Sequence, residues 1–122
     1  MTMSKSEELQ LIPLSEKYIE YILKIIFKIP RVEKYSIGTE YKKSMYEMLR
    51  QIMYINKLEN SLRLEMLNKI DAELNTQRIF LRIMYKSRLI DEKKFNVAMG
   101  MVYEIGKVLG GIIKYYGKNN KK

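Results

Sequence analysis

The sequence contains neither cysteine nor histidine among its 122 residues. Without cysteine there are no disulfides and no thiol nucleophiles, and without histidine there is no acid–base catalysis by imidazole. The usual ligands of zinc sites are also missing. Carboxylate metal sites stay open, but the 14 Asp and Glu residues are scattered along the chain rather than grouped. We therefore predict no catalytic residue, no metal, no cofactor and no enzyme activity.

Targeting and membrane-spanning signals are lacking as well. Residues 1–14 are polar, carry Glu7 and Glu8, and have no basic head or cleavage site of a secretory signal. Because no run of 18 uninterrupted apolar residues occurs, we expect no membrane span and a cytoplasmic location. The length suits one domain. We divide the chain into an N-terminal segment (1–14), a helical bundle (15–116) and a basic tail (117–122).

Proline is scarce, and Pro13 and Pro30 are the only two in the chain. The remaining residues are mostly good helix formers, and no strand-like alternation bounded by turn residues appears. We predict an all-α protein whose four helices, joined by short connections, form an antiparallel up-down-up-down bundle. The predicted helices span residues 15–29 with Ser15 as N-cap and Pro30 as terminator, residues from the Thr39 N-cap to a polar break at 56–61, residues 61–88, and residues from the Asp91 N-cap to about 116.

The apolar residues exceed what one bundle needs. The last helix has an unbroken 3-4-3-4-3-4 seam from Phe95 to Tyr116, which suits packing along neighbouring helices. Six of the seven residues 79–85 and six of the eight residues 22–29 are apolar. A bundle helix needs only about three apolar positions in seven. This surplus favours self-association, and a bundle with unusually wide apolar faces is the alternative.

Positive charge is the most informative part of the composition. Lys and Arg number 23 against 14 acids, which gives a net charge of +9 and predicts affinity for polyanions such as nucleic acid. Arg78, Arg82 and Lys86 follow one another at four-residue spacing and form a ridge on one helix face. They are candidate contacts to phosphate or carboxylate, for which arginine is well suited. The alternative is that the ridge is only solvated, or that its cations are there because positive charge is favourable near the C-terminal end of a helix.

The connection after Pro30 is also basic, with Arg31, Lys34, Lys42 and Lys43 around a Ser-Ile-Gly-Thr turn. The firmer interpretation of this connection is a turn between two helices. A second interpretation is that its cations contact a polyanion. Tyr35 and Tyr41 beside it are candidates for stacking on bases, although tyrosine at helical spacing also suits a core edge.

Gly106 and Gly110 lie four residues apart in the last helix. Each glycine lowers helix propensity by roughly 1 kcal/mol relative to alanine. We predict that both allow another backbone to approach closely.

Two stretches carry a resemblance to a known family. The run IPRVEKYSIGTEYKKSMYEMLRQI resembles the elbow of the four-helix-bundle family. That family includes the accessory variability determinant (Avd) of diversity-generating retroelements and the proteins encoded in ribosomal RNA intervening sequences. The run YEIGKVLGGIIKYY resembles the last helix of the Avd branch. The matching residues are Pro30, Arg31, Glu33, Lys34, Tyr35, Ile37 and Gly38 in the elbow, and Glu104, Ile105, Gly106, Leu109, Gly110 and Gly111 in the last helix.

The resemblance covers about residues 11–116 and implies a homopentameric ring with a basic surface. It implies a protein that does no chemistry and binds a reverse transcriptase together with template RNA or complementary DNA. Arg78 and Arg82 then fall where the third helix of the family is basic, and Lys86 is a weaker correspondence. Lys42 and Lys43 rest on charge alone. The alternative is a structural oligomeric bundle that contacts proteins and whose charge is incidental.

Overall fold

The computed structural model describes the backbone of residues 2–120 and the side chains of residues 10–118. This part of the chain is all helical, as predicted, and contains four long helices. Two short helices connect them at the turns. Residues 1, 121 and 122, which belong to the predicted N-terminal segment and basic tail, lie outside the described residues. In chain order the elements are α1 (Thr2–Lys28), α2 (Arg31–Lys34), α3 (Ile37–Tyr54), η1 (Ile55–Lys57), α4 (Asn60–Lys86) and α5 (Glu92–Asn120).

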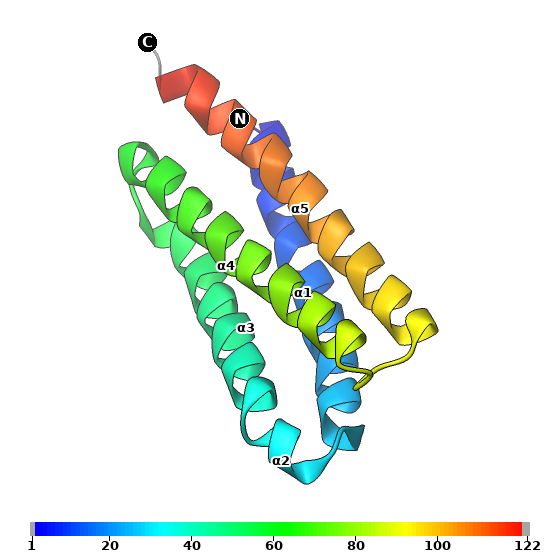
Figure 1. Ribbon diagram of the computed structural model, residues 1–122. Coiled ribbons are helices and arrows are strands. Elements are labelled where there is room, and N and C mark those ends of the chain that lie inside the picture. Colours follow the sequence, from blue (N-terminus) through cyan, green and yellow to red (C-terminus); the bar gives the residue numbers. More distant parts are fainter. Residues whose placement is uncertain (1, 121–122) are drawn as a thin grey trace.

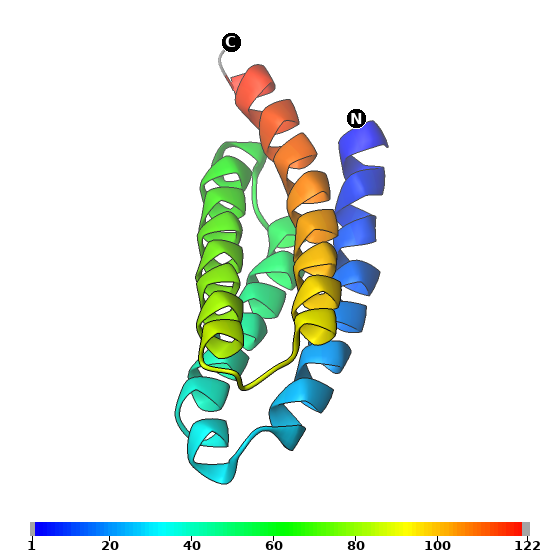
Figure 2. The same cartoon turned by 45° about the vertical axis from the view of Figure 1, so that its right-hand side comes forward.

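The chain turns back on itself after each long helix, and both termini lie at the same end (Figure 1). Helix α5 packs between α1 and α4, and α3 packs beside α4, whereas the contact between α1 and α3 is less extensive. Figure 2 shows α4 and α5 side by side at the front, joined at the bottom by the turn of residues 87–91. The elbow around α2 lies at that same end, which we call the elbow end.

Helix α1 begins well before the predicted start. Pro13 lies inside the helix and is exposed, and Ser15 is a buried helical residue rather than an N-cap. The buried positions Leu11, Ser15, Tyr18 and Ile22 follow a 4-3-4 spacing, so the core seam continues across the proline. Burial of Leu11 offsets the hydrogen bond that proline removes. The prediction of a helix start at Ser15 was therefore wrong.

The elbow turn depends on Gly38. A Cβ atom there would lie 3.0 Å from Ile26 Cγ2 and 3.3 Å from the Glu33 carbonyl oxygen, so α1, α2 and α3 could not meet as closely around a larger residue. Helix α3 begins at Ile37, and the Thr39 hydroxyl donates a long hydrogen bond to the Lys34 carbonyl (3.4 Å). Thr39 is thus within the helix, and its predicted N-cap role was wrong.

The turn between α4 and α5 is built by hydrogen bonds at both helix ends. The Leu89 N–H donates to the Met84 carbonyl at 2.8 Å and the Arg88 N–H to the Tyr85 carbonyl at 3.0 Å, the pattern of a Schellman motif. Arg88 adopts a positive φ of 63° at its centre. Asp91 Oδ1 accepts the Lys94 N–H at 2.8 Å, which confirms the predicted N-cap.

The α5 seam is confirmed, with a polar cluster nearby in the core. Six of its members are buried, while Phe95 is partly buried: the buried ones are Ala98, Val102, Ile105, Leu109, Ile112 and Tyr116. Within the same bundle, the Tyr18 hydroxyl donates to Gln77 Oε1 at 2.8 Å and lies 2.8 Å from the Tyr41 hydroxyl. Burial raises the pKa of both tyrosines well above the ordinary value. Tyr41 is therefore a core residue, which supports the core interpretation of its position and excludes stacking on bases.

Helix α5 qualifies by length and composition as a membrane span over Glu92–Lys118. The expectation from uninterrupted apolar runs therefore does not exclude a span. The seam of this helix packs against α1 and α4, and a bundle core selects for the same apolar composition.

Candidate nucleic-acid interface

Arg78, the first residue of the predicted ridge, lies in a notch between α4 and α5. Its Nη2 atom is 2.6 Å from the point where a Cβ at Gly106 would be, and its Nη1 donates to Asn75 Oδ1. The missing side chain at Gly106 therefore makes room for the guanidinium. Arg78 is half-buried and makes no ion pair with the described residues.

Within the described chain, Gly106 and Gly110 of α5 are not approached by another backbone, contrary to the prediction. The close neighbours of Gly106 are the Arg78 and Leu74 side chains, not another backbone. A Cβ at Gly110 would meet nothing within 4 Å. Apart from α5 itself, no backbone of the described chain is among the close neighbours of either glycine. Approach by a second copy stays a prediction.

Arg82 and Lys86 continue the ridge toward the elbow end, and both are exposed. Residue spacing of four places the three cations on one face of α4. Lys86 also lines the hollow described below. The ridge thus leads from the notch at Gly106 toward the basic end of the molecule.

Two cations of the elbow, Arg31 and Lys34, each lie over an exposed aromatic ring. Arg31 Cζ lies 5.9 Å from the centre of the Tyr35 ring, and Lys34 Nζ lies 4.8 Å from the centre of the Phe27 ring. Both rings are unusually open, since Phe27 is 73% and Tyr35 69% exposed. Cations over exposed rings present charge and a flat apolar surface together. This pairing suits a ligand that has both phosphate and bases.

Lys42 and Lys43 are less available. Lys42 is half-buried, and Lys43 Nζ lies 3.6 Å from Glu40 Oε2. Both partners of this ion pair are exposed, so the pair is weak and contributes little to stability. Lys43 thus faces a local carboxylate, whereas Lys86 and Arg88 near the α4–α5 turn make no ion pair with the described residues.

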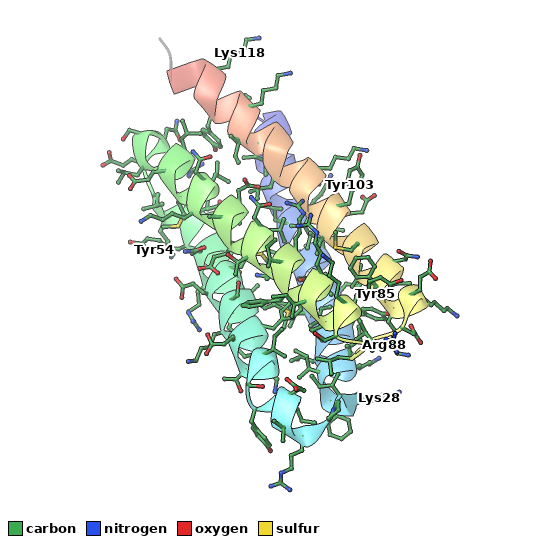
Figure 3. All side chains as sticks on the ribbon, in the orientation of Figure 1. Lys28, Tyr54, Tyr85, Arg88, Tyr103 and Lys118 are labelled. Carbon is green, nitrogen blue, oxygen red and sulfur yellow. The ribbon has the colours of Figure 1, made fainter. Side chains whose placement is uncertain are left out.

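A hollow of about 610 Å³ lies at the elbow end. Four cations line it, and three of them, Lys28, Arg88 and Lys94, were not among the predicted site residues. Figure 3 shows Lys28, Tyr85 and Arg88 gathered at this end, with Lys118 at the opposite end. The lining consists of Ile25, Lys28, Ile29, Tyr85, Lys86, Arg88, Leu89, Ile90, Asp91 and Lys94.

Bundle topology contains the signal that would have found these residues. In an up-down-up-down chain the first and third long helices end at the same end of the molecule. Residues 28–34 and 86–94 are then neighbours, and together they hold seven Lys and Arg against three acids. Helical spacing identifies the ridge and local charge identifies the elbow, but only the bundle topology brings the two together.

The site lies beside a fixed aromatic pair. Tyr85 and Phe95 stack with ring centres 4.5 Å apart at an interplanar angle of 14°, which ties the end of α4 to the start of α5. Hydrogen bonds to the Lys94 N–H and Nζ, together with the positive charges of Lys94 and Lys93, hold the pKa of Asp91 below its ordinary value. Asp91 therefore stays ionised at neutral pH and offsets part of the local positive charge.

These features define a class: a four-long-helix protein whose elbow end gathers cations around a hollow. A family model described as bAvd-like matches residues 9–116. Because the match covers most of the sequence, the chain belongs to the bAvd-like family. The family indicates an accessory role in diversity-generating retroelements. No curated protein matches the chain.

Proposed function

We propose that this chain is a non-enzymatic accessory protein of a diversity-generating retroelement. In this proposal it binds template RNA or complementary DNA together with the retroelement reverse transcriptase, and so supports mutagenic retrohoming. It works in the cytoplasm and away from membranes. Membership of the bAvd-like family supports the accessory role.

The observation that carries the nucleic-acid part is the cation cluster at the elbow end. Lys28, Lys86 and Arg88 converge on one hollow and make no ion pair with any described residue. Like charges held together are unfavourable unless an anion neutralises them. A polyanion with regularly spaced phosphates provides that neutralisation at several positions at once.

We further propose that the antiparallel bundle assembles into a homopentameric ring. Apolar side chains remain exposed on α3 and α4, where Met53, Tyr54, Ile79 and Ile83 are between 44% and 54% exposed. Burial of such residues against another copy or against the polymerase would remove apolar surface from water. Segment 22–29 contributes less to this surface than predicted, because Phe27 is its exposed apolar residue and the others lie in or against the core.

The first test is the native mass by light scattering at 0.15 M salt, alone and with a structured RNA. We expect a mass of about five subunits that grows when RNA is added. The RNA affinity should fall with salt at a log–log slope of about 0.7–0.9 per phosphate contacted. A 14.6 kDa monomer that ignores RNA would contradict both the ring and the binding role.

A structural oligomer that contacts proteins is the second candidate. It is favoured by the exposed apolar residues Ile79 and Ile83, which share one face of α4 at four-residue spacing. Such contacts depend on packing and respond little to salt. An assembly that forms and holds its protein partner equally well at low and high salt, without binding RNA or DNA, would select this candidate.

A further inference from the structure

The hollow at the elbow end combines two kinds of wall. We call its four cations, Lys28, Lys86, Arg88 and Lys94, the basic cup. The remaining lining is mainly apolar and includes Ile25, Ile29, Leu89 and Ile90, with the Tyr85 ring beside them. Its volume of about 610 Å³ falls within the range of about 300–1,000 Å³ that is typical of small-ligand pockets.

The charges of the basic cup are largely uncompensated. Lys94 Nζ lies 3.2 Å from Asp91 Oδ2, which is the one ion pair formed by a cup residue within the described chain. Lys28, Lys86 and Arg88 come from the ends of α1 and α4 and from the turn that follows α4. Three cations are thus left facing one small space. A phosphate group is the anion whose oxygens can accept hydrogen bonds from several of them together.

One of these cations, Arg88, adopts a strained backbone conformation. Arg88 has φ 63° at the centre of the Schellman motif, where glycine is the usual residue. An L-residue with a side chain is less stable in this left-handed conformation than glycine. The Arg88 side chain makes no hydrogen bond or ion pair with the described residues. The strain is therefore consistent with a ligand contact.

The apolar and aromatic walls of the hollow favour single-stranded nucleic acid over a duplex. A duplex presents its phosphates outward and keeps its bases stacked inside, so it would fill only the cationic part of the hollow. A single strand can turn one base toward a side chain, as strand-binding proteins exploit with aromatic residues. Tyr85 is 37% exposed, lines the hollow and is held by its stack on Phe95.

We propose that the basic cup binds one nucleotide of a single-stranded segment of nucleic acid. The phosphate contacts Arg88, Lys86 and Lys28, and the base packs on the wall that includes Tyr85. This inference rests on the proposed function, because it names the form of nucleic acid and the place where it is held.

The test compares four single variants of the full-length protein with wild type. Affinities for a fluorescent single-stranded RNA, the matching single-stranded DNA and the matching RNA duplex are measured by anisotropy over a salt series. Arg88→Gly and Tyr85→Leu alter the site. Lys57→Gln, at an exposed position of η1, and Tyr103→Leu, at a 63% exposed position of α5, are the matched controls.

Arg88→Gly gives the most informative result because stability and binding should change in opposite directions. Relief of the strained φ should raise Tm by about 3–6 °C. Loss of the cation should weaken single-strand binding several-fold and lower the log–log salt slope by about 0.7. A drop in affinity caused by misfolding would instead lower Tm. Tyr85→Leu should weaken single-strand binding by about five-fold or more, leave the salt slope unchanged and leave duplex binding almost unaffected.

The results distinguish a failure of the basic cup from a failure of the proposed function. If wild type binds RNA or DNA but the site variants and their controls lose affinity equally, the basic cup is wrong and the proposed function stands. If Tyr85→Leu weakens duplex and single strand alike, the single-strand assignment is wrong. If wild type binds neither RNA nor DNA, the nucleic-acid part of the proposed function fails, and the cup fails with it.

Discussion

Arg63 and Arg88 lie near opposite ends of α4, and the protein treats them differently. Arg63 Nε donates to the Leu58 carbonyl at 3.0 Å and its Nη1 donates to the Tyr116 hydroxyl at 2.8 Å. Its guanidinium also lies 5.9 Å from the centre of the Tyr116 ring. Arg88 has no such contact with the described residues and sits in a strained conformation. One arginine closes a turn, and the other remains available to a ligand.

The segments at the two ends of the bundle also differ in charge, and the excess of cations lies at the end that holds Arg88. Residues 54–65, around η1, hold two cations and two acids. Residues 28–34 and 86–94, at the elbow end, hold seven cations and three acids. Net charge along the chain does not reveal this contrast, because it depends on which segments the fold brings together. Under the proposed function, the presence or absence of an internal partner separates a structural cation from one that binds nucleic acid.

Arg63→Ala should produce the largest change in stability. It removes charged hydrogen bonds to a backbone carbonyl and to a tyrosine, and should lower the free energy of unfolding by about 1–3 kcal/mol. Nucleic-acid affinity should stay the same, because the residue lies at the opposite end from the hollow. Urea unfolding and RNA anisotropy on the same sample check both statements. Loss of RNA affinity in the folded variant would remove the contrast between the two ends.

Gly38→Ala should destabilise the elbow end by about 1–2 kcal/mol. The added Cβ would crowd the Ile26 methyl group and the Glu33 carbonyl, and this overpacking exceeds the gain in helix propensity. Urea unfolding measures the loss. Because the change pushes α3 away from α1 and α2 and so shifts the elbow, RNA affinity should fall as well. An unchanged stability would mean that the turn relaxes easily and does not fix the cations of the elbow.

Gly110→Ala should have the opposite sign and stabilise the isolated chain by up to about 1 kcal/mol. A Cβ there meets nothing within 4 Å, so only the improved helix propensity remains. Thermal unfolding and light scattering measured together provide the check. A loss of stability with a smaller native mass would show that a second copy packs on this face, away from both turns.

The smallest effect should come from Asp91 at acid pH. Because its folded pKa lies below the ordinary value of 3.8, its contribution to stability is present above about that pH. That contribution is lost as the pH falls through the lower folded pKa. Thermal unfolding from pH 5 to pH 2 should show a shallower decline for Asp91→Asn, which keeps a capping oxygen without the charge. Parallel curves for the two proteins would contradict this.

Local signals made much of the fold predictable. The 3-4 spacing of α5, the Asp91 cap and the stop before Pro30 depend on residues within a few positions of one another. The start of α1 was not predictable in the same way, because burial of Leu11 overrides the proline signal. The hydrogen bond from Tyr18 to Gln77 joins residues 59 positions apart, so no local pattern indicates that Tyr41 and Gln77 share a buried cluster.

The candidate site was only partly predictable for the same reason. Arg78, Arg82 and Lys86 follow from helical spacing, and the elbow cations follow from a charge cluster. The role of Gly106 as a notch for a guanidinium requires the relative position of α4 and α5. Lys28 and Arg88 become neighbours only when the ends of α1 and α4 meet. The φ of Arg88 cannot be read from residue types, since glycine is the expected residue there.

Hydrogen–deuterium exchange of the wild-type protein, with and without a single-stranded RNA, tests most directly whether nucleic acid binds at the elbow end. We expect the strongest added protection in peptides that cover residues 28–34 and 86–94. Peptides around residues 54–65 should exchange at the same rate with and without RNA. Protection concentrated at residues 54–65 and missing from the elbow end would show that nucleic acid does not bind at the elbow end.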